Sequence, residues 1–244
     1  MGSIPHNIFL SGAVLLLIGL CLGGYLLFLK AENTELDVHT YEIIEKSAQI
    51  RVYTQSVHTE AELSDRTLTI EGIYRIDEPN GRYETLATTT VRFNDESHAF
   101  FLHTTTLGDE TYVLVETKSE LLKSVIPHGP WKRFTNDTIP AEYKDIAPTG
   151  PVLDNLRIFS DGLKYLRYTG SEGDWYSFTV SDEDPAVGGT LESLLRRIGP
   201  GGHVRVRLEH DRARELVFEN ETYRSNTVID IAEPSLFISA PSIE

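Results

Sequence analysis

A run of 22 consecutive residues without any charge, Ile8 to Leu29, constrains this chain more than any other feature of its sequence. At a rise of about 1.5 Å per residue, a helix of this length spans about 33 Å, enough to cross a hydrocarbon core of about 30 Å. Uncharged runs this long are rare in soluble cores, which disfavours a buried core helix. The sequence therefore predicts a transmembrane helix, with residues 1–30 as a membrane anchor and residues 31–40 as a polar linker.

A cleaved signal peptide is the main alternative to a retained anchor. The apolar region of a signal peptide is about 7–15 residues long and is followed by small residues at the cleavage site. This run is longer and ends in Leu29-Lys30-Ala31. A lipid-modified Cys21 is disfavoured, because Leu20 stands where a small residue is needed. Cys21 is also the single cysteine, so no intrachain disulfide forms.

The orientation of the anchor depends on weak signals. Lys30 is the one Lys or Arg beside the apolar run, and the positive-inside rule would place its side in the cytoplasm. Large domains, however, are translocated largely regardless of charge. Because the run lies at the N-terminus, it resembles an uncleaved signal anchor. We therefore predict a single-pass membrane protein with an extracytoplasmic domain over residues 41–234 and a C-terminal tail over residues 235–244.

The charge balance excludes one class of partner. The chain has 22 Lys and Arg against 37 Asp and Glu, which gives a formal net charge of −15. Binding to nucleic acid needs a basic surface that neutralises phosphates. Docking of the domain on an anionic lipid surface would need one as well. We therefore predict no nucleic-acid partner.

The domain opens with a helical pattern and continues with strands. Apolar residues at Tyr41, Ile44, Ala48 and Val52 follow one side of a helix, which predicts an amphipathic helix over Tyr41–Glu60. From Thr67 to Thr117 the period changes to two, and the alternating segments are separated by turns at Glu78-Pro79-Asn80-Gly81, Asn94-Asp95-Glu96 and Gly108-Asp109-Glu110. This pattern predicts a four-stranded antiparallel meander with one apolar face, which is typical of a sheet covered on one side only.

The remaining segments alternate between short helices and strands. The predicted helices are Ser119–Val125, Val152–Phe159 and Thr190–Ile198, and a long loop is predicted over Thr135–Pro151. The predicted strands are Trp131–Phe134, Lys164–Tyr168, Trp175–Val180, His203–Glu209, Arg214–Glu219 and Thr222–Ile231. The predicted fold class is therefore α+β, a large antiparallel sheet with few helices.

This order of elements resembles a known family of envelope proteins. The features that carry the resemblance are the leading amphipathic helix, the meander, the strand Trp131-Lys132-Arg133-Phe134 before a Pro-rich loop, the segment Asp174–Val180, and the closing strands from His203 onward. Together they are similar to the LolA/LppX-like superfamily of lipoprotein and lipid carriers. The resemblance implies a curved half-barrel, closed by helices over an apolar cavity. The soluble carriers of that family shuttle freely, whereas a tethered chain suits a role in holding, handing off or sensing a ligand.

An apolar ligand site would lie on the covered face of the sheet. If the helices do not fill this concave face, a cavity remains that takes a lipid or the acyl chain of a lipidated polypeptide. The alternative for each residue is a position in a filled core. The expected lining residues are Leu68, Ile70, Tyr74, Tyr83, Val91, Phe93, Phe101, Val113 and Phe178.

Known catalytic patterns are missing from the sequence. There is no HExxH, no G-x-S-x-G and no P-loop. His98 and His103 are five residues apart in one strand and so face opposite sides, which argues against a shared metal. The acidic run Ser181-Asp182-Glu183-Asp184 lacks the spacing of a calcium loop and indicates a solvated turn. We predict no catalytic residue, metal or cofactor.

Two other functions stay open on the sequence alone. One is an envelope sensor or protein-interaction module of the same fold without a small ligand. The other is an envelope hydrolase whose Ser, His and carboxylate are brought together only by folding. The expected partners are thus the membrane through residues 8–29, a lipid or lipoprotein, and an envelope protein.

Overall fold

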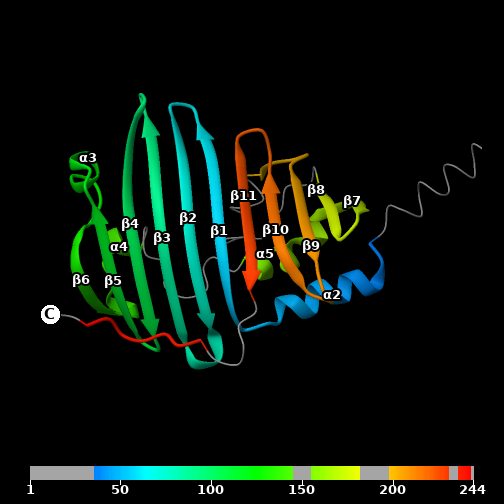
Figure 1. The fold of residues 1–244 in the computed structure, drawn as a ribbon, viewed down its shortest axis with the longest axis horizontal. Coiled ribbons are helices and arrows are strands. Elements are labelled where there is room, and N and C mark those ends of the chain that lie inside the picture. The colour runs from blue at the N-terminus through cyan, green and yellow to red at the C-terminus, as the bar shows by residue number, and fades with distance from the viewer. Residues whose placement is uncertain (1–35, 145–154, 182–197, 231–235, 243–244) are drawn as a thin grey trace, which may run out of the picture.

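The sheet dominates the structure. The computed structural model describes residues 36–144, 155–181, 198–230 and 236–242. Within them, eleven strands form one sheet in the order β6-β5-β4-β3-β2-β1-β11-β10-β9-β8-β7, and the paired strands are antiparallel. The sheet does not close in this part of the chain, because β6 and β7 form its two edges (Figure 1). The predicted fold class, a large antiparallel sheet with few helices, is confirmed.

Three of the four strands of the first meander have 12 residues each, and the last has 8. They are joined by tight turns, and Asn94 and Asp95 adopt φ values of 48° and 64°, as a two-residue hairpin turn requires. The prediction of four strands between Thr67 and Thr117 is confirmed. The bounds of the first six strands are β1 Val52–Leu63, β2 Arg66–Asp77, β3 Arg82–Phe93, β4 Glu96–Leu107, β5 Glu110–Thr117 and β6 Gly129–Thr135.

The second half of the sheet follows the predicted strands closely. Its bounds are β7 Leu166–Glu172, β8 Trp175–Val180, β9 His203–Leu208, β10 Ala213–Glu219 and β11 Tyr223–Asp230. The helices are short, and their bounds are α2 Val38–Ala48, α3 Glu120–Lys123, α4 Ala141–Lys144 and α5 Asn155–Gly162, with single 3-10 turns at Glu78–Asn80, Asn136–Thr138 and Leu163–Tyr165. The predicted helix Thr190–Ile198 and the acidic run Ser181–Asp184 fall almost entirely outside the described residues.

The predicted helix Tyr41–Glu60 is wrong in its second half. The helix α2 begins after Asp37, whose side chain accepts a hydrogen bond from the backbone N–H of Thr40 at 2.9 Å, and it ends at Ala48. From Val52 onward the chain is strand β1, in which alternate residues from Tyr53 to Ala61 are buried. The positions Ala48 and Val52 continued the helical spacing by coincidence, because the period-two pattern of β1 overlapped with it.

Two polar contacts hold the helices against the sheet. The Ser47 hydroxyl on α2 donates to the backbone oxygen of Ile43 at 2.7 Å and accepts from the backbone N–H of Ala213 at 2.9 Å. On α5, the Asn155 amide donates to the Thr227 hydroxyl of β11 at 2.6 Å. Both contacts are buried, where an unpaired polar group would cost free energy. They fix α2 and α5 on the same side of the sheet.

We call this side the helix face, and the opposite side the open face. In Figure 1 the open face is turned toward the viewer, and α4 and α5 lie behind the strands. No helix in the described ranges is long and apolar enough to cross a membrane. The predicted transmembrane segment, residues 8–29, lies outside those ranges.

Candidate ligand-binding site

The helix face carries two separate core clusters. The first lies under α2 and α5 and includes Ile44, Phe159, Phe178, Val204 and Leu216, all at most 2% exposed. The second lies on the same face under α4, near the β6 edge of the sheet, and consists of Leu102, Val113, Val115, Ile139 and Tyr143. Different helices therefore pack on the helix face toward its two edges.

Between the two clusters lies a zone of the helix face that belongs to neither. Strand register places Ile70 opposite Thr89, Gly72 opposite Ala87, and Val91 opposite Leu68, which itself packs against the first cluster. We call Ile70, Gly72, Tyr74, Ala87 and Val91 the middle zone. Ile70 and Val91 are only partly buried, and Phe93 at the end of the same row is 39% exposed. Apolar surface is thus left between the cores.

The structure divides the nine predicted lining residues into groups. Phe178 belongs to the first core cluster and Val113 to the second, while Leu68 and Tyr83 pack against the first. Ile70, Tyr74, Val91 and Phe93 lie on the helix face outside both clusters, as the register of β2 and β3 shows. Eight of the nine therefore share one face, and four of these lie in or beside the middle zone.

Phe101 lies on the other face. It pairs with Thr88 across β3 and β4, whereas its neighbour Phe100 pairs with Thr89 and packs against the second core cluster. Both residues are aromatic, so their sequence does not tell which one faces the helices. His98 and His103 lie on opposite faces, as their spacing predicts. The His98 ring forms a hydrogen bond with the Ser119 hydroxyl on the helix face, and the His103 ring forms one with the Glu84 carboxylate on the open face.

The ring of Tyr74 covers Gly72 in the middle zone. A Cβ atom at Gly72 would lie 2.9 Å from the Tyr74 ring, so this ring lies directly over the glycine. Glycine is needed here because a side chain would compete with the ring for the same space. Burial raises the pKa of Tyr74 to about 12, because the phenolate would be poorly solvated. The pKa of Tyr83, beside the zone, is raised by burial and by the nearby Glu78 carboxylate.

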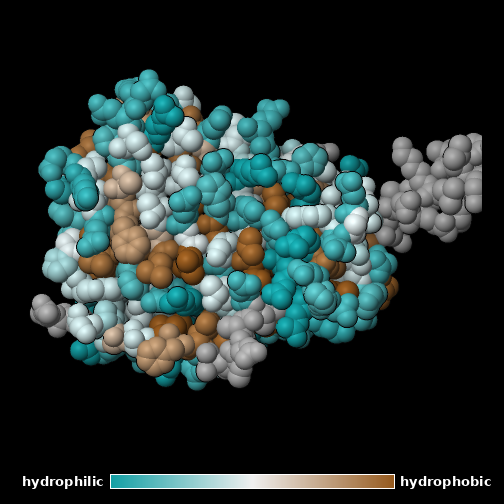
Figure 2. Space-filling view, viewed as in Figure 1, coloured by the Kyte–Doolittle hydropathy of each residue, from teal (hydrophilic) through white to brown (hydrophobic). Residues whose placement is uncertain are grey.

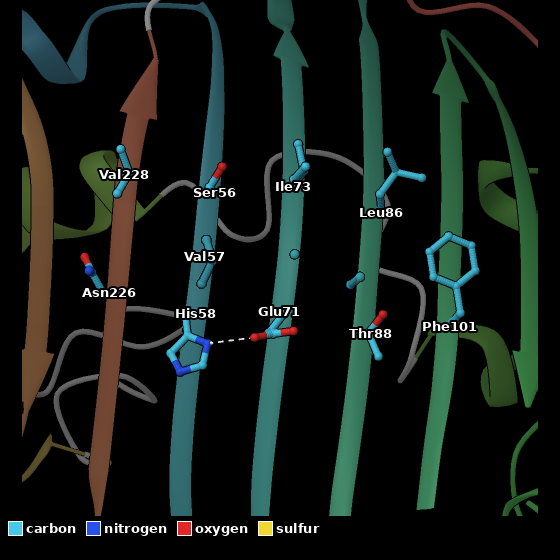
Figure 3. Close-up of a pocket in the computed structure, with 12 residues that line it drawn as sticks. Ser56, Val57, His58, Glu71, Ile73, Leu86, Thr88, Phe101, Asn226 and Val228 are labelled. Carbon is cyan, nitrogen blue, oxygen red and sulfur yellow. Dashed lines mark ion pairs between the residues drawn. The ribbon is translucent and has the colours of Figure 1, made fainter.

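The open face has an apolar patch, which sequence analysis missed. We define it by Ile73, Leu86, Phe101 and Val228, which surround a shallow depression of about 390 Å³. Figure 2 shows apolar side chains gathered over the middle strands of this face, within hydrophilic surroundings. In Figure 3 the patch residues lie on β11, β2, β3 and β4, and the His58 imidazole on β1 lies 3.4 Å from the Glu71 carboxylate beside them.

A charged network adjoins the patch. The Glu84 carboxylate accepts hydrogen bonds from Arg75 at 2.5 Å and from His103 at 3.0 Å, and its side chain is 12% exposed. The His103 hydrogen bond and the Arg75 guanidinium hold the pKa of Glu84 below its ordinary value, against the effect of burial. His103 in turn packs edge-on against Trp131, with ring centroids 4.7 Å apart.

We expect Glu84→Gln to lower the free energy of unfolding by about 1–3 kcal/mol at neutral pH, because Arg75 and His103 lose a charged acceptor. A carboxyl whose pKa is lowered by folding stabilises the protein above its unfolded pKa, and this contribution is lost as pH falls through the folded value. The difference between wild type and variant should therefore shrink below about pH 4.5. Urea unfolding at a series of pH values measures it, and a difference that is constant with pH would contradict the role of Glu84.

Comparison with known proteins identifies similar folds. No family model matches this chain, and no curated protein matches it. Among solved structures, LprF from Mycobacterium bovis is 13% identical, with 84% of this chain and 98% of that chain covered at a TM-score of 0.47. The lipoprotein LppX from Mycobacterium tuberculosis is 12% identical and covers 84% and 100%, at a TM-score of 0.37. A β-barrel-like protein of a domain of unknown function from Brucella abortus is 12% identical, at 0.26.

At these identities the similarity concerns the fold.

Proposed function

We propose that this chain is a membrane-tethered, extracytoplasmic domain that binds the apolar part of a lipid or of a lipidated polypeptide on the helix face of its sheet. The observation that supports the proposal is the middle zone. Ile70 and Val91 are partly buried apolar residues on the covered face, yet they pack into neither core cluster. An acyl chain laid along β2 and β3 would cover them.

The energy of such binding comes from burial of the chain. Each buried methylene contributes about 0.8 kcal/mol, so fifteen methylenes give at most about 12 kcal/mol. Association costs at least about 4 kcal/mol in lost translation and rotation. For long-chain lipids the free energy of burial therefore exceeds the cost of association, whereas for short-chain lipids it does not. Residues 8–29, as a membrane anchor, would keep the site close to the bilayer that supplies these lipids.

Photo-crosslinking in lipid nanodiscs tests the proposal with the full chain. A long-chain fatty acid that carries a photoreactive group near its end is included among the nanodisc lipids and activated by light. Trypsin cleavage at Arg66, Arg75, Arg82 and Arg92 separates the peptides 67–75 and 83–92, which hold the middle zone, from residues 8–29. We expect the label on these two peptides in addition to any label on the anchor.

A matched pair of variants shows which face takes the label. Ile70 and Ile73 lie on the same strand but on opposite faces. We expect Ile70→Glu to reduce labelling of both peptides at least tenfold, because a carboxylate in an apolar site is poorly solvated. Ile73→Glu should leave the labelling unchanged. Loss of label in Ile73→Glu, with label retained in Ile70→Glu, would place the ligand on the open face and overturn the proposal.

The open face supports a second candidate, the binding of a protein partner. Ile73 is 41% exposed and Val228 is 40% exposed. Ile73 lies opposite Leu86 on β3, and Ser56 of β1 lies between Ile73 and Val228. Exposed apolar patches that are surrounded by polar residues mark interaction sites. The absence of any lipid label on peptides 67–75 and 83–92 would favour this candidate.

A further inference from the structure

Folding brings a serine, a histidine and a carboxylate together where β4 begins. The Ser119 hydroxyl lies 2.9 Å from Nδ1 of His98. On the other side of the same ring, Nε2 of His98 lies 3.6 Å from the Glu96 carboxylate. Glu96 and His98 belong to β4, whereas Ser119 comes from the segment between β5 and α3. The sequence contains no known catalytic motif, so this arrangement becomes visible only in the fold.

A single arrangement of protons satisfies all three groups. The Ser119 hydroxyl accepts a hydrogen bond from the backbone N–H of Leu122 at 3.3 Å, which leaves its own proton for donation. An imidazole protonated on Nε2 accepts this proton at Nδ1 and directs its N–H at the Glu96 carboxylate. A hydroxyl next to an imidazole that is oriented in turn by a carboxylate is the arrangement that activates a serine as a nucleophile.

A surface pocket adjoins the serine and the histidine. Both residues line it, together with Phe100 and Phe101, and its volume is about 750 Å³. Pockets of this size accommodate small-molecule ligands. The described part of the chain offers no acceptor to the backbone N–H of Glu120, the residue after Ser119. In serine hydrolases the N–H after the nucleophile stabilises the negative oxygen that forms when the carbonyl is attacked.

The pair of side chains also adjoins the middle zone. His98 lies directly opposite Val91 of β3 on the helix face. Directly opposite residues have Cβ atoms about 5 Å apart, so the two side chains are neighbours. An acyl chain that covers Ile70 and Val91 would therefore have one end beside His98. A carbonyl group at this end comes close to the Ser119 hydroxyl.

We propose that Ser119, His98 and Glu96 form a hydrolytic site for a long-chain acyl ester, with Ser119 as nucleophile, His98 as general base and Glu96 as a positioning residue. The place of the acyl chain rests on the proposed function, to which this inference adds a reaction. His98 takes the Ser119 proton while Oγ attacks the carbonyl carbon, and it returns the proton to the alcohol oxygen as the ester C–O bond breaks. Water then attacks the acyl-serine, loses its proton to His98, and releases the fatty acid and Ser119.

A fluorophosphonate with a long alkyl chain tests the inference on the full chain in nanodiscs. An activated serine attacks its phosphorus, fluoride leaves, and the serine stays labelled. Trypsin cleavage after Lys118 and Lys123 releases the peptide 119–123, in which Ser119 is the single hydroxyl. The next peptide, 124–132, has Ser124 as its single hydroxyl and is the internal control. We expect Ser119 to be labelled about 100-fold faster than Ser124, because only Ser119 has a base.

Variants separate activation of the serine from binding of the probe. His98→Asn keeps an amide beside Ser119 but cannot take its proton, so the maximal labelling rate should fall about 100-fold at an unchanged half-saturating probe concentration. Glu96→Gln should lower the maximal rate by a smaller factor, because the Glu96 side chain is 78% exposed and water partly replaces it. His128→Asn makes the matched change at an exposed histidine outside the site and should leave the rate unchanged.

Turnover of a long-chain p-nitrophenyl ester provides a second measurement. Ser119→Asn keeps a side chain that caps α3 but has no nucleophile, and it should abolish release of p-nitrophenol. Release that persists in this variant, equal labelling of Ser119 and Ser124, or unchanged labelling in His98→Asn would overturn the hydrolytic site. The proposed function would still stand if the photoreactive fatty acid labels peptides 67–75 and 83–92. Labelling of Ser119 without that crosslink would support the hydrolytic site and overturn the proposed place of the acyl chain.

Discussion

Phe159→Ala should lower the free energy of unfolding by about 3–5 kcal/mol, the usual cost of removing a buried phenylalanine. Phe159 is 1% exposed and, together with Leu156, places α5 in the first core cluster. Its ring meets that of Phe178 on β8 edge-on, with centroids 5.5 Å apart. The truncation removes this aromatic contact and leaves a cavity between α5 and the sheet, which the rigid strands cannot close.

The matched control is the same substitution at Phe237, which is 87% exposed. Phe237→Ala should change the free energy of unfolding by no more than about 0.5 kcal/mol. Urea unfolding of the full chain in detergent, followed by tryptophan fluorescence, measures both variants. Equal effects would mean that α5 does not stabilise the sheet. The first core cluster would then not bound the middle zone on the α5 side, and the proposed site would have to be placed elsewhere.

The hairpins were predictable because their signals are local. Between Thr67 and Thr117 the strands alternate strictly, and the Asn94-Asp95 turn interrupts the alternation where the chain reverses. The strand β1 was missed because Val52 continues the helical spacing of Tyr41, Ile44 and Ala48. Nothing local distinguishes the two readings, and pairing of β1 with both β2 and β11 decides in favour of the strand.

The sequence predicted which face of the sheet carries the candidate site, but not which residues of that face are buried in the core clusters. Alternation assigned Ile70, Tyr74 and Val91 to one side of the sheet correctly. It could not tell that Val113 and Phe178 fill the two cores, because this depends on where α4 and α5 pack.

Gly202→Ala should lower the free energy of unfolding by about 3 kcal/mol, at the upper end of the cost of overpacking. A Cβ atom at this position would overlap the Ile198 side chain and lie 2.7 Å from the Ile198 backbone oxygen. Ile198 is 1% exposed in the first core cluster, so it has no room to yield. The turn is also bonded to β8, because the Val180 N–H donates to the Gly202 oxygen at 3.0 Å and the Gly201 N–H donates to the Val180 oxygen at 3.2 Å.

Gly72→Ala is the informative comparison, because its new Cβ atom also meets a neighbour at 2.9 Å, but that neighbour is the outer edge of the Tyr74 ring. The ring can turn away, and replacing a strand glycine by alanine gains about 0.5–1 kcal/mol in conformational entropy. The two terms nearly cancel, so thermal unfolding of Gly72→Ala should stay close to wild type while Gly202→Ala unfolds at a clearly lower temperature. A large loss of stability in Gly72→Ala would instead mean that the Tyr74 ring is fixed by its surroundings and does not adjust to a ligand.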